Sequence, residues 1–302
     1  MSSITEKNYP TTTPLKVCFL GLGAMGFPMA GHLQAAGHQV TVYNRNPAKA
    51  QAWVEEFGAR SAIDPSQAAQ GADIVFACVG NDDSLREVTL GENGAFHGMK
   101  LGAIFVDHTT TSAEVAKEIA AQAQARGLHF IDAPVSGGQA GAINGVLTVM
   151  CGGQNEAFEK VKPVIDVYAR SVVLMGPHGS GQLCKMVNQI CLGGLLQGLS
   201  EAIAFGERTG LDMQQVLSVI GKGAAQSWQM ENRGPTMLAG KFDFGFAVDW
   251  MRKDLGLVFD EAKRNGAKLP LTELVDSFYA QIQANGGNRM DTSSLITLLR
   301  KN

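Results

Sequence analysis

The sequence predicts an α/β domain with a mostly parallel sheet, followed by an all-helical domain that is joined to it through one long helix. Short β-branched runs alternate with helical stretches over residues 14–176, and no convincing strand pattern occurs beyond them. A single uninterrupted helical pattern then runs over residues 181–208. Strands separated by helices of this length indicate βαβ units, which build parallel sheets.

The first domain is expected over residues 14–176, after a polar tail at 1–13 that is expected to be disordered. Its strands are predicted from short apolar runs and its helices from the amphipathic stretches between them. The predicted strands are 16–20, 39–43, 74–79, 104–107, 129–132, 148–151 and 171–175. The predicted helices include 25–36, 47–57 and 112–126.

The second domain is expected over residues 177–302 and contains only helices. After the long helix, apolar periodicity predicts helices at 212–221, 246–265, 271–285 and 293–300. Small residues, such as Gly193, Gly194 and Gly198, recur along the long helix, although a glycine inside a helix costs about 0.5–1 kcal/mol relative to alanine. Close approach of another helix or chain would compensate for this cost, so we expect a subunit interface there.

The composition is that of a globular protein and excludes several functional classes. Lys+Arg 25 against Asp+Glu 28 gives the 302 residues a net charge of −3, so the chain lacks the basic footprint of a nucleic-acid binder. It contains no apolar run of about 18 residues, the length that a membrane span requires. The five cysteines form no CxxC pair and no metal-ligand spacing. We therefore expect a cytoplasmic protein without a metal, membrane or nucleic-acid partner.

The strongest motif follows the first predicted strand directly. Residues 21–26 read G-L-G-A-M-G, which is the G-x-G-x-x-G pattern, and a helix is predicted to begin within it. The glycines permit a tight turn, allow the backbone to approach a pyrophosphate, and let the helix pack closely on the sheet. The helix N-terminus then faces the phosphates. The predicted dinucleotide-binding residues are Gly21, Leu22, Gly23, Ala24, Met25 and Gly26.

The end of the second predicted strand indicates which dinucleotide is preferred. A carboxylate at this place would accept a hydrogen bond from the ribose 2′-hydroxyl and would repel a 2′-phosphate. This chain has the neutral Asn44 followed by Arg45, and a guanidinium is a planar donor suited to a phosphate. NADP(H) is therefore predicted in preference to NAD(H).

Two further segments carry groups that point to a reaction. Residues 132–138 read D-A-P-V-S-G-G, and the backbone amides of Ser136, Gly137 and Gly138 offer a nest for a carboxylate. Lys185 lies near the start of the long helix and Asn188 lies three residues further on, so both share one helix face. Lysine is rarely buried without a partner. Taken alone, Lys185 is better explained as a surface lysine near a helix start, and the rest of the chain reverses this interpretation.

Four motifs resemble, in order, those of the β-hydroxyacid dehydrogenase family. This family includes 3-hydroxyisobutyrate dehydrogenase, tartronate semialdehyde reductase (2-hydroxy-3-oxopropionate reductase) and the glyoxylate and succinic semialdehyde reductases. The matching segments are 21–30, 132–138, 179–188 and 253–255. The resemblance covers the chain from residue 15 to its C-terminus. It implies a Rossmann domain and a helical domain, with the active site in the cleft between them.

The resemblance also implies roles for individual positions. Lys185 matches the catalytic lysine of the family, and Asn188 matches its partner on the helix, which we expect to contact the substrate as well. The loop that binds the substrate carboxylate matches Ser136, Gly137 and Gly138. Contacts to the cofactor match Thr110, Phe246 and Lys253.

The chemistry implied is hydride transfer between the nicotinamide and the carbon that carries the substrate hydroxyl. Because the cofactor carries the hydride, the protein has to orient the substrate and move a proton. We expect Lys185 to act as the general acid during reduction and as the general base during oxidation. The expected substrate is a short 3-hydroxy acid or its semialdehyde, such as 3-hydroxyisobutyrate or tartronate semialdehyde.

Two alternatives share this architecture. Dinucleotide-binding scaffolds without activity tend to lose the lysine, which this chain keeps as Lys185. Imine reductases lack both that lysine and the loop at 136–138. We therefore expect an enzyme that acts on CH–OH donors, takes a small carboxylate-bearing substrate, and assembles as a homodimer or homotetramer.

Overall fold

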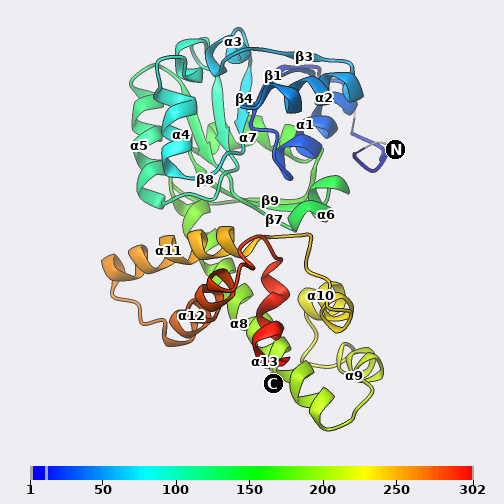
Figure 1. The fold of residues 1–302 in the computed structure, drawn as a ribbon. Coiled ribbons are helices and arrows are strands. Elements are labelled where there is room, and N and C mark those ends of the chain that lie inside the picture. Colours follow the sequence, from blue (N-terminus) through cyan, green and yellow to red (C-terminus); the bar gives the residue numbers. More distant parts are fainter. Residues whose placement is uncertain (1–2, 11–12, 301–302) are drawn as a thin grey trace. The chain divides into compact units, whose positions relative to one another are not determined.

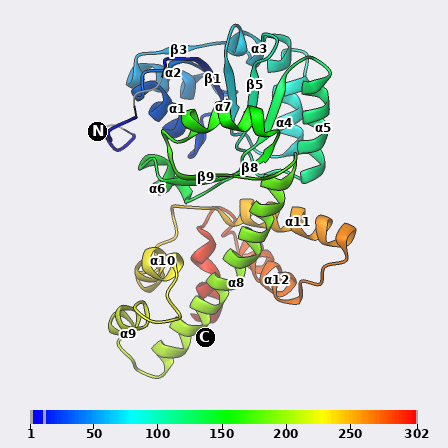
Figure 2. The same cartoon turned by 180° about the vertical axis from the view of Figure 1, so that it is seen from behind.

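The computed structural model describes residues 3–10 and 13–300, and the chain divides into two compact units, Met1–Lys185 and Met186–Asn302 (Figures 1 and 2). The first unit contains the sheet and the second is helical. The sequence pattern changes at 176–178, whereas the units divide within helix α8 (Ser180–Arg208). The first turn of α8 belongs to the first unit, and Gln182 in this turn is hydrogen-bonded to Asp132 and Thr109 there.

A single sheet of nine strands forms the centre of the first unit, within the part of the chain that the structure describes. The strands are β1 (Lys16–Leu20), β2 (Gln39–Tyr43), β3 (Arg60–Ser61), β4 (Ile74–Ala77), β5 (Ile104–Asp107), β6 (His129–Asp132), β7 (Val135–Ser136), β8 (Leu147–Gly153) and β9 (Ala169–Gly176). Their order is β3-β2-β1-β4-β5-β6-β8-β7, and β9 pairs with β8. Neighbours from β3 to β6 are parallel, whereas β8 is antiparallel to β6 and β7. The mostly parallel sheet expected from the sequence is confirmed.

The observed strands differ from the predicted ones mainly in length. β8 and β9 extend beyond the predicted 148–151 and 171–175, and β4 ends at Ala77 rather than at residue 79. β3 and β7 were not predicted, because strands of two residues are too short to show an alternating pattern.

Strand residues alternate between two faces of this sheet, and helices cover both faces (Figure 1). Val17 and Phe19 of β1 belong to an apolar cluster with residues of α1, α2 and α7. Cys18 and Leu20 belong to a second cluster with residues of α3, α4 and α5. The helices of the first unit are α1 (Gly26–Ala35), α2 (Pro47–Phe57), α3 (Pro65–Ala69), α4 (Asp82–Leu90), α5 (Ala113–Gln124), α6 (Gly138–Ile143) and α7 (Asn155–Ile165), with a 3₁₀ turn η1 (Ala95–His97). The apolar strands are thus buried on both faces, as parallel sheets require.

Part of the segment predicted to be a disordered tail, residues 3–10, makes hydrogen bonds to the rest of the first unit. The Thr5 backbone N–H donates to the Ile143 carbonyl (2.9 Å), and Lys7 Nζ donates to the Gly145 carbonyl (2.9 Å). The Tyr9 hydroxyl lies 2.6 Å from Nδ1 of the buried His32. These bonds hold residues 5–9 against α1 and the end of α6.

The second unit consists of helices that pack around two apolar clusters. They are the remainder of α8, α9 (Met213–Ile220), α10 (Trp228–Leu238), α11 (Val248–Asn265), α12 (Pro270–Ala284) and α13 (Thr297–Arg300), with the 3₁₀ turn η2 (Thr292–Ile296). One cluster joins α8 to α11 and α12, and the other joins α8 to α9 and α10. Helix α10 was not predicted, because Gly234 and Pro235 lie inside it and this pair is typical of a turn. Among the described helices, none combines the length and apolar character needed to cross a membrane.

Candidate dinucleotide and substrate site

The turn between β1 and α1 has the geometry that a dinucleotide requires. Gly21 adopts φ +96°, and a Cβ at this position would collide with the Cys78 carbonyl. A Cβ at Gly26 would collide with the Gly21 carbonyl, whereas a Cβ at Gly23 would have nothing within 4 Å. The backbone at Gly23 is therefore open to an approaching pyrophosphate, next to the N-terminus of α1. These residues fit the dinucleotide that the motif predicts.

Asn44, at the end of β2, fixes this turn through its side chain. Its Oδ1 accepts a hydrogen bond from the Leu22 backbone N–H (2.9 Å), and its Nδ2 donates to the Asn46 carbonyl (2.9 Å). Asn46 in turn caps the N-terminus of α2 by accepting from the Ala48 backbone N–H (3.0 Å). Arg45 lies between these two asparagines and is exposed to solvent. Its guanidinium is thus available at a helix N-terminus, where anions are favoured.

The turn that follows β5 carries Thr110, which is half-buried. Thr109 Oγ1 accepts from the Val79 backbone N–H (3.0 Å), and the Thr109 backbone N–H donates to Asp107 Oδ1 (3.0 Å). The Gln182 side chain contacts both neighbours of Thr110. Its Nε2 donates to the Thr109 carbonyl (2.8 Å), and its Oε1 accepts from the Thr111 backbone N–H (3.0 Å).

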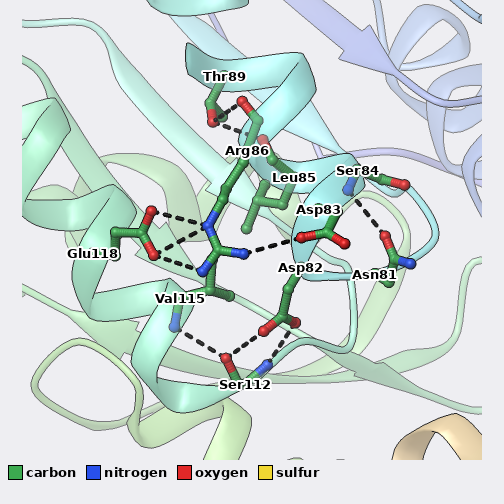
Figure 3. A network of polar contacts seen from close by, with 10 residues as sticks. All are labelled: Asn81, Asp82, Asp83, Ser84, Leu85, Arg86, Thr89, Ser112, Val115 and Glu118. Atoms are coloured by element: carbon green, nitrogen blue, oxygen red, sulfur yellow. Dashed lines mark hydrogen bonds and ion pairs between the residues drawn. The ribbon is translucent and has the colours of Figure 1, made fainter. Parts of the chain in front are cut away.

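The far side of the same turn is tied to α4 and α5 by a polar network (Figure 3). Ser112 caps α5 by accepting from the Val115 backbone N–H (3.0 Å), and its hydroxyl and backbone N–H both donate to the Asp82 carboxylate. Arg86 of α4 makes a forked ion pair with Glu118 of α5, with a shortest contact of 2.7 Å. Contacts between α4 and α5 therefore also hold together the segments that follow β4 and β5.

Asp132, at the end of β6, anchors the start of α8. Its fully buried carboxylate accepts from the backbone N–H groups of Gly179 (2.8 Å) and Gln182 (3.1 Å). Burial raises the pKa of Asp132 to about 6, although these backbone hydrogen bonds act in the opposite direction. A carboxylate at a helix N-terminus also interacts favourably with the helix dipole. Two of the sequence motifs, 132–138 and 179–188, are thus joined directly.

Asp107 and His108 are buried beside this anchor. Asp107 pairs in register with Asp132 on the neighbouring strand. Burial raises the pKa of Asp107 to about 7, and its Oδ2 has no hydrogen-bond partner among the described residues. Burial lowers the pKa of His108 to about 4, and its ring nitrogens lie 2.6 Å from the Ala133 carbonyl and 2.8 Å from the Tyr168 hydroxyl. A neutral His108 therefore donates from Nδ1 and accepts at Nε2.

The predicted carboxylate loop joins β7 to α6. Ser136 is the last residue of β7 and pairs with Thr148 of β8. Gly137 and Gly138 have φ of +130° and +61°, values that favour glycine. All three residues are partly exposed.

Lys185 is 7% exposed and lies one turn after Gln182 on α8. Asn188 follows after another turn and belongs to the second unit. Its Nδ2 donates to Gln189 Oε1 (2.8 Å), and Gln189 Nε2 donates to Asp254 Oδ2 (2.7 Å). The other oxygen of Asp254 lies 3.0 Å from Lys253 Nζ. Asn188 and Lys253, which were predicted from separate motifs, are thus connected within the second unit.

Phe246 is held by a second buried carboxylate of the second unit. Its backbone N–H donates to Asp291 Oδ2 (2.9 Å), and its carbonyl accepts from the Thr292 backbone N–H (2.9 Å). Asp291 also makes an ion pair with Arg233 (3.1 Å), whose guanidinium lies 5.2 Å from the centre of the Trp228 ring. These contacts fix the backbone that presents Phe246.

Sequence reasoning missed the residues that connect the predicted ones. Gln182, Gln189 and Asp291 were not singled out, and Asp132 was named only as the start of a motif. Gln182 and Gln189 are polar residues in a segment of small and apolar ones, which is a weak signal by itself. Their partners are 71 to 73 and 65 residues away in the chain, so only the folded structure reveals the contacts.

Two family models match the chain in succession. One is described as the NAD binding domain of 6-phosphogluconate dehydrogenase and matches residues 16–176. The other is described as NAD-binding of NADP-dependent 3-hydroxyisobutyrate dehydrogenase and matches residues 179–299.

Similar proteins match along nearly the whole length. An uncharacterized oxidoreductase of Shewanella frigidimarina is 63% identical over 286 residues, which are 95% of this chain and 98% of the relative. The 2-hydroxy-3-oxopropionate reductase of Escherichia coli is 35% identical over 285 residues, which cover 94% and 97% of the two chains. The solved structure of Mycobacterium tuberculosis 3-hydroxyisobutyrate dehydrogenase with L-serine has a TM-score of 0.86 at 29% identity, and the match covers 96% of this chain and 100% of that one.

Proposed function

Because the chain belongs to the β-hydroxyacid dehydrogenase family and is an oxidoreductase of CH–OH donors, we propose that it transfers hydride between NADP(H) and a short 3-hydroxy acid or the matching semialdehyde. The observation that carries this proposal is the setting of Lys185. The residue is buried on α8, one turn after a segment bonded to Asp132 and to the turn around Thr110. A buried amine on a helix whose first turn is bonded to these strand ends is a candidate for proton transfer rather than for solvation.

Each of the residues has a separate role in this reaction. When bound, the nicotinamide supplies or accepts the hydride. Lys185 donates a proton to the carbonyl oxygen during reduction and removes it from the hydroxyl during oxidation. Asn188, one turn away on the same helix, orients the reacting oxygen. The backbone N–H groups of the loop at 136–138 hold the substrate carboxylate.

The preference for NADP(H) is supported by the end of β2. Arg45 is exposed at the N-terminus of α2, where a 2′-phosphate gains both a guanidinium and the helix dipole. Asn44 uses its carbonyl oxygen on Leu22 and brings no negative charge. The description of the family model that matches 179–299 also names an NADP-dependent dehydrogenase. Thr110, Phe246 and Lys253 are the further cofactor contacts that we propose.

The substrate class is supported by the names of the relatives. L-serine, named with the Mycobacterium tuberculosis structure, has a carboxylate close to a hydroxymethyl group. The name 2-hydroxy-3-oxopropionate describes a three-carbon acid with an aldehyde. We propose 3-hydroxyisobutyrate, tartronate semialdehyde or a compound of the same size for this chain.

Assembly as a homodimer or homotetramer also belongs to this proposal. Helix α8 exposes the apolar side chains of Leu183 (37%), Val187 (61%) and Leu195 (48%). Val187 follows Leu183 by four residues and Leu195 follows Val187 by eight, so the three lie along one side of the helix. Such a row of apolar side chains is suited to burial against a second subunit. All five cysteines are free, which supports the reducing cytoplasm as the compartment.

The first prediction concerns the proposed role of Lys185 as the general acid and base. Lys185→Ala is expected to lower kcat for NADPH-dependent reduction by about 10²–10⁴-fold, the usual effect of losing a general acid. The Kd for NADPH is expected to change by less than about threefold, since other residues bind the dinucleotide. A panel of short aldehyde acids with NADPH, and of hydroxy acids with NADP⁺, measures the first effect, and fluorescence titration measures the second.

Lys160→Ala removes an exposed lysine of α7 and serves as the matched control, with wild-type turnover expected. Full activity in Lys185→Ala would remove the lysine from the mechanism. Absence of turnover by the wild type with every member of the panel would contradict the proposed substrate class.

A further inference from the structure

We propose that Gln182 is a positioning residue that holds the turn around Thr110 and the helix turn of Lys185 in one rigid frame. The inference rests on the proposed function, because it takes Thr110 as a cofactor contact and Lys185 as the acid/base. The side chain of Gln182 keeps Thr110 and Lys185 at a constant distance and orientation.

The contacts of Gln182 bracket Thr110 from both sides. The amide Nε2 donates to the carbonyl of the preceding residue, Thr109 (2.8 Å), and Oε1 accepts from the backbone N–H of the following residue, Thr111 (3.0 Å). The Gln182 side chain is fully buried. A primary amide offers a donor and an acceptor together without a charge and does so at every pH of the physiological range, whereas a carboxylic acid of the same length does so only when it is protonated.

The backbone of Gln182 is fixed independently of its side chain. Its N–H donates to Asp132 Oδ2 (3.1 Å), and the Gly179 N–H donates to the other oxygen of that carboxylate (2.8 Å). A Cβ at Gly181 would collide with the Met150 carbonyl, so the helix also lies directly against β8. The first turn of α8 therefore cannot shift without breaking bonds to both β6 and the turn after β5.

Lys185 follows Gln182 by three residues and therefore lies on the same face of α8. A displacement of this turn moves the amine relative to the dinucleotide site. Misplacement of a reacting group by about 1 Å can cost about 10²-fold in rate. Loss of the amide should thus lower kcat, while substrate KM, which reflects the loop at 136–138, should change little.

Two variants of Gln182 test the inference. Gln182→Met keeps the length of the side chain and removes both hydrogen bonds. Gln182→Glu keeps the acceptor for the Thr111 N–H but, when ionised, has no donor for the Thr109 carbonyl. A protonated glutamic acid restores a donor and an acceptor, so its activity relative to wild type should recover as the pH falls. The matched control is Gln197→Met, on the same helix, whose buried amide donates to Glu201 one turn away (2.8 Å).

The measurements are kcat and KM over a range of pH, NADP⁺ affinity by fluorescence, and amide hydrogen exchange of the protein without cofactor. For Gln182→Met we expect kcat to fall about 10- to 100-fold, KM to change by less than about threefold, and exchange to accelerate in 109–112 and 179–185. Gln197→Met should keep the wild-type kcat and exchange in those two segments. Gln182→Glu should regain activity on acidification, and Gln182→Met should not.

Several outcomes would overturn the inference. They are a wild-type kcat in Gln182→Met, an equal fall in kcat in Gln197→Met, or a Gln182→Glu profile parallel to that of the wild type. Should Gln182→Met fail to fold, the pH profile of Gln182→Glu decides the matter. Failure of the proposed function is distinguishable, because then either the wild type would turn over no member of the panel or Lys185→Ala would keep its turnover. An inactive Lys185→Ala together with an unaffected Gln182→Met rejects only the role of Gln182.

Discussion

At the scale of single residues, Arg45 is the side chain on which coenzyme choice should depend. Arg45→Ala is expected to raise KM for NADPH about 10- to 100-fold, because a charge-assisted hydrogen bond contributes about 1.5–3 kcal/mol. KM for NADH should stay within about twofold, since NADH has no 2′-phosphate. Steady-state kinetics with both coenzymes at a saturating substrate concentration measure this difference.

The control for Arg45 is Arg126→Ala, since Arg126 is also exposed in the first unit but bonds to Gln122 on the surface. Its KM values for both coenzymes should equal those of the wild type. An equal rise in both KM values in Arg45→Ala would show that Arg45 does not recognise the 2′-phosphate.

Asp107 is the residue whose ionisation should be most visible in protein stability. Because burial raises its pKa from the ordinary 3.8 to about 7, the folded protein keeps a proton that the unfolded chain has released between these values. The free energy of unfolding therefore falls as the pH rises through this window. Asp107→Asn removes the titration, so its stability relative to wild type should increase from pH 5 to pH 8, by roughly 1–4 kcal/mol.

Thermal unfolding of both proteins across this range tests the effect of Asp107. The buried histidines titrate in both proteins, so their contribution cancels in the difference. Asp132 repels the ionised form of Asp107, so the loss of that charge in Asp107→Asn favours ionisation of Asp132 and adds to the expected difference in the same direction. Asp83→Asn, at a side chain that is 90% exposed, should give a constant difference. Parallel curves for Asp107→Asn and the wild type would mean that Asp107 is ionised in the folded state at pH 5.

At the scale of elements, helix caps should matter more than ion pairs where α4 meets α5 (Figure 3). Ser112→Ala loses the cap of α5 and the bonds from the hydroxyl to Asp82, so it should cost about 0.5–2 kcal/mol of unfolding free energy. Glu118→Gln weakens a pair whose side chains are 42% and 41% exposed, which should cost about 0.2–1 kcal/mol. Urea denaturation gives both values, and a larger loss in Glu118→Gln than in Ser112→Ala would contradict this order.

At the scale of the whole molecule, the exposed apolar row of α8 predicts self-association. Light scattering should give a mass that is two or four times 32.0 kDa. Val187→Asp places a charge in this row and should shift the protein towards the monomer, because burying an unpaired charge is costly. Ile63→Asp, at a position of the first unit that is 83% exposed, should keep the wild-type mass. A monomeric wild type would exclude the interface.

Much of the fold could be predicted because its elements are marked by local patterns. β1, β2, β5 and β6 have the predicted bounds, and so does α2, since each is an apolar or amphipathic run bordered by turn residues. The short strands β3 and β7 and helix α10 escaped prediction. Two paired residues leave no period to detect, and Pro235 within α10 signals a turn although its neighbours continue as a helix.

For the site, local motifs were sufficient to identify the residues proposed to bind the dinucleotide and to move a proton, from the glycines of the turn after β1 to Lys185. The motifs are short and local, so their residue types and spacing can be recognised without a fold. The contacts that hold these residues in place became visible in the folded protein. Asp132 on the first turn of α8, Gln182 around Thr110 and Gln189 on Asp254 are contacts between segments far apart in the chain. Such hydrogen bonds depend on strand register and helix placement, which arise from packing of the whole core and leave no periodic trace in the sequence.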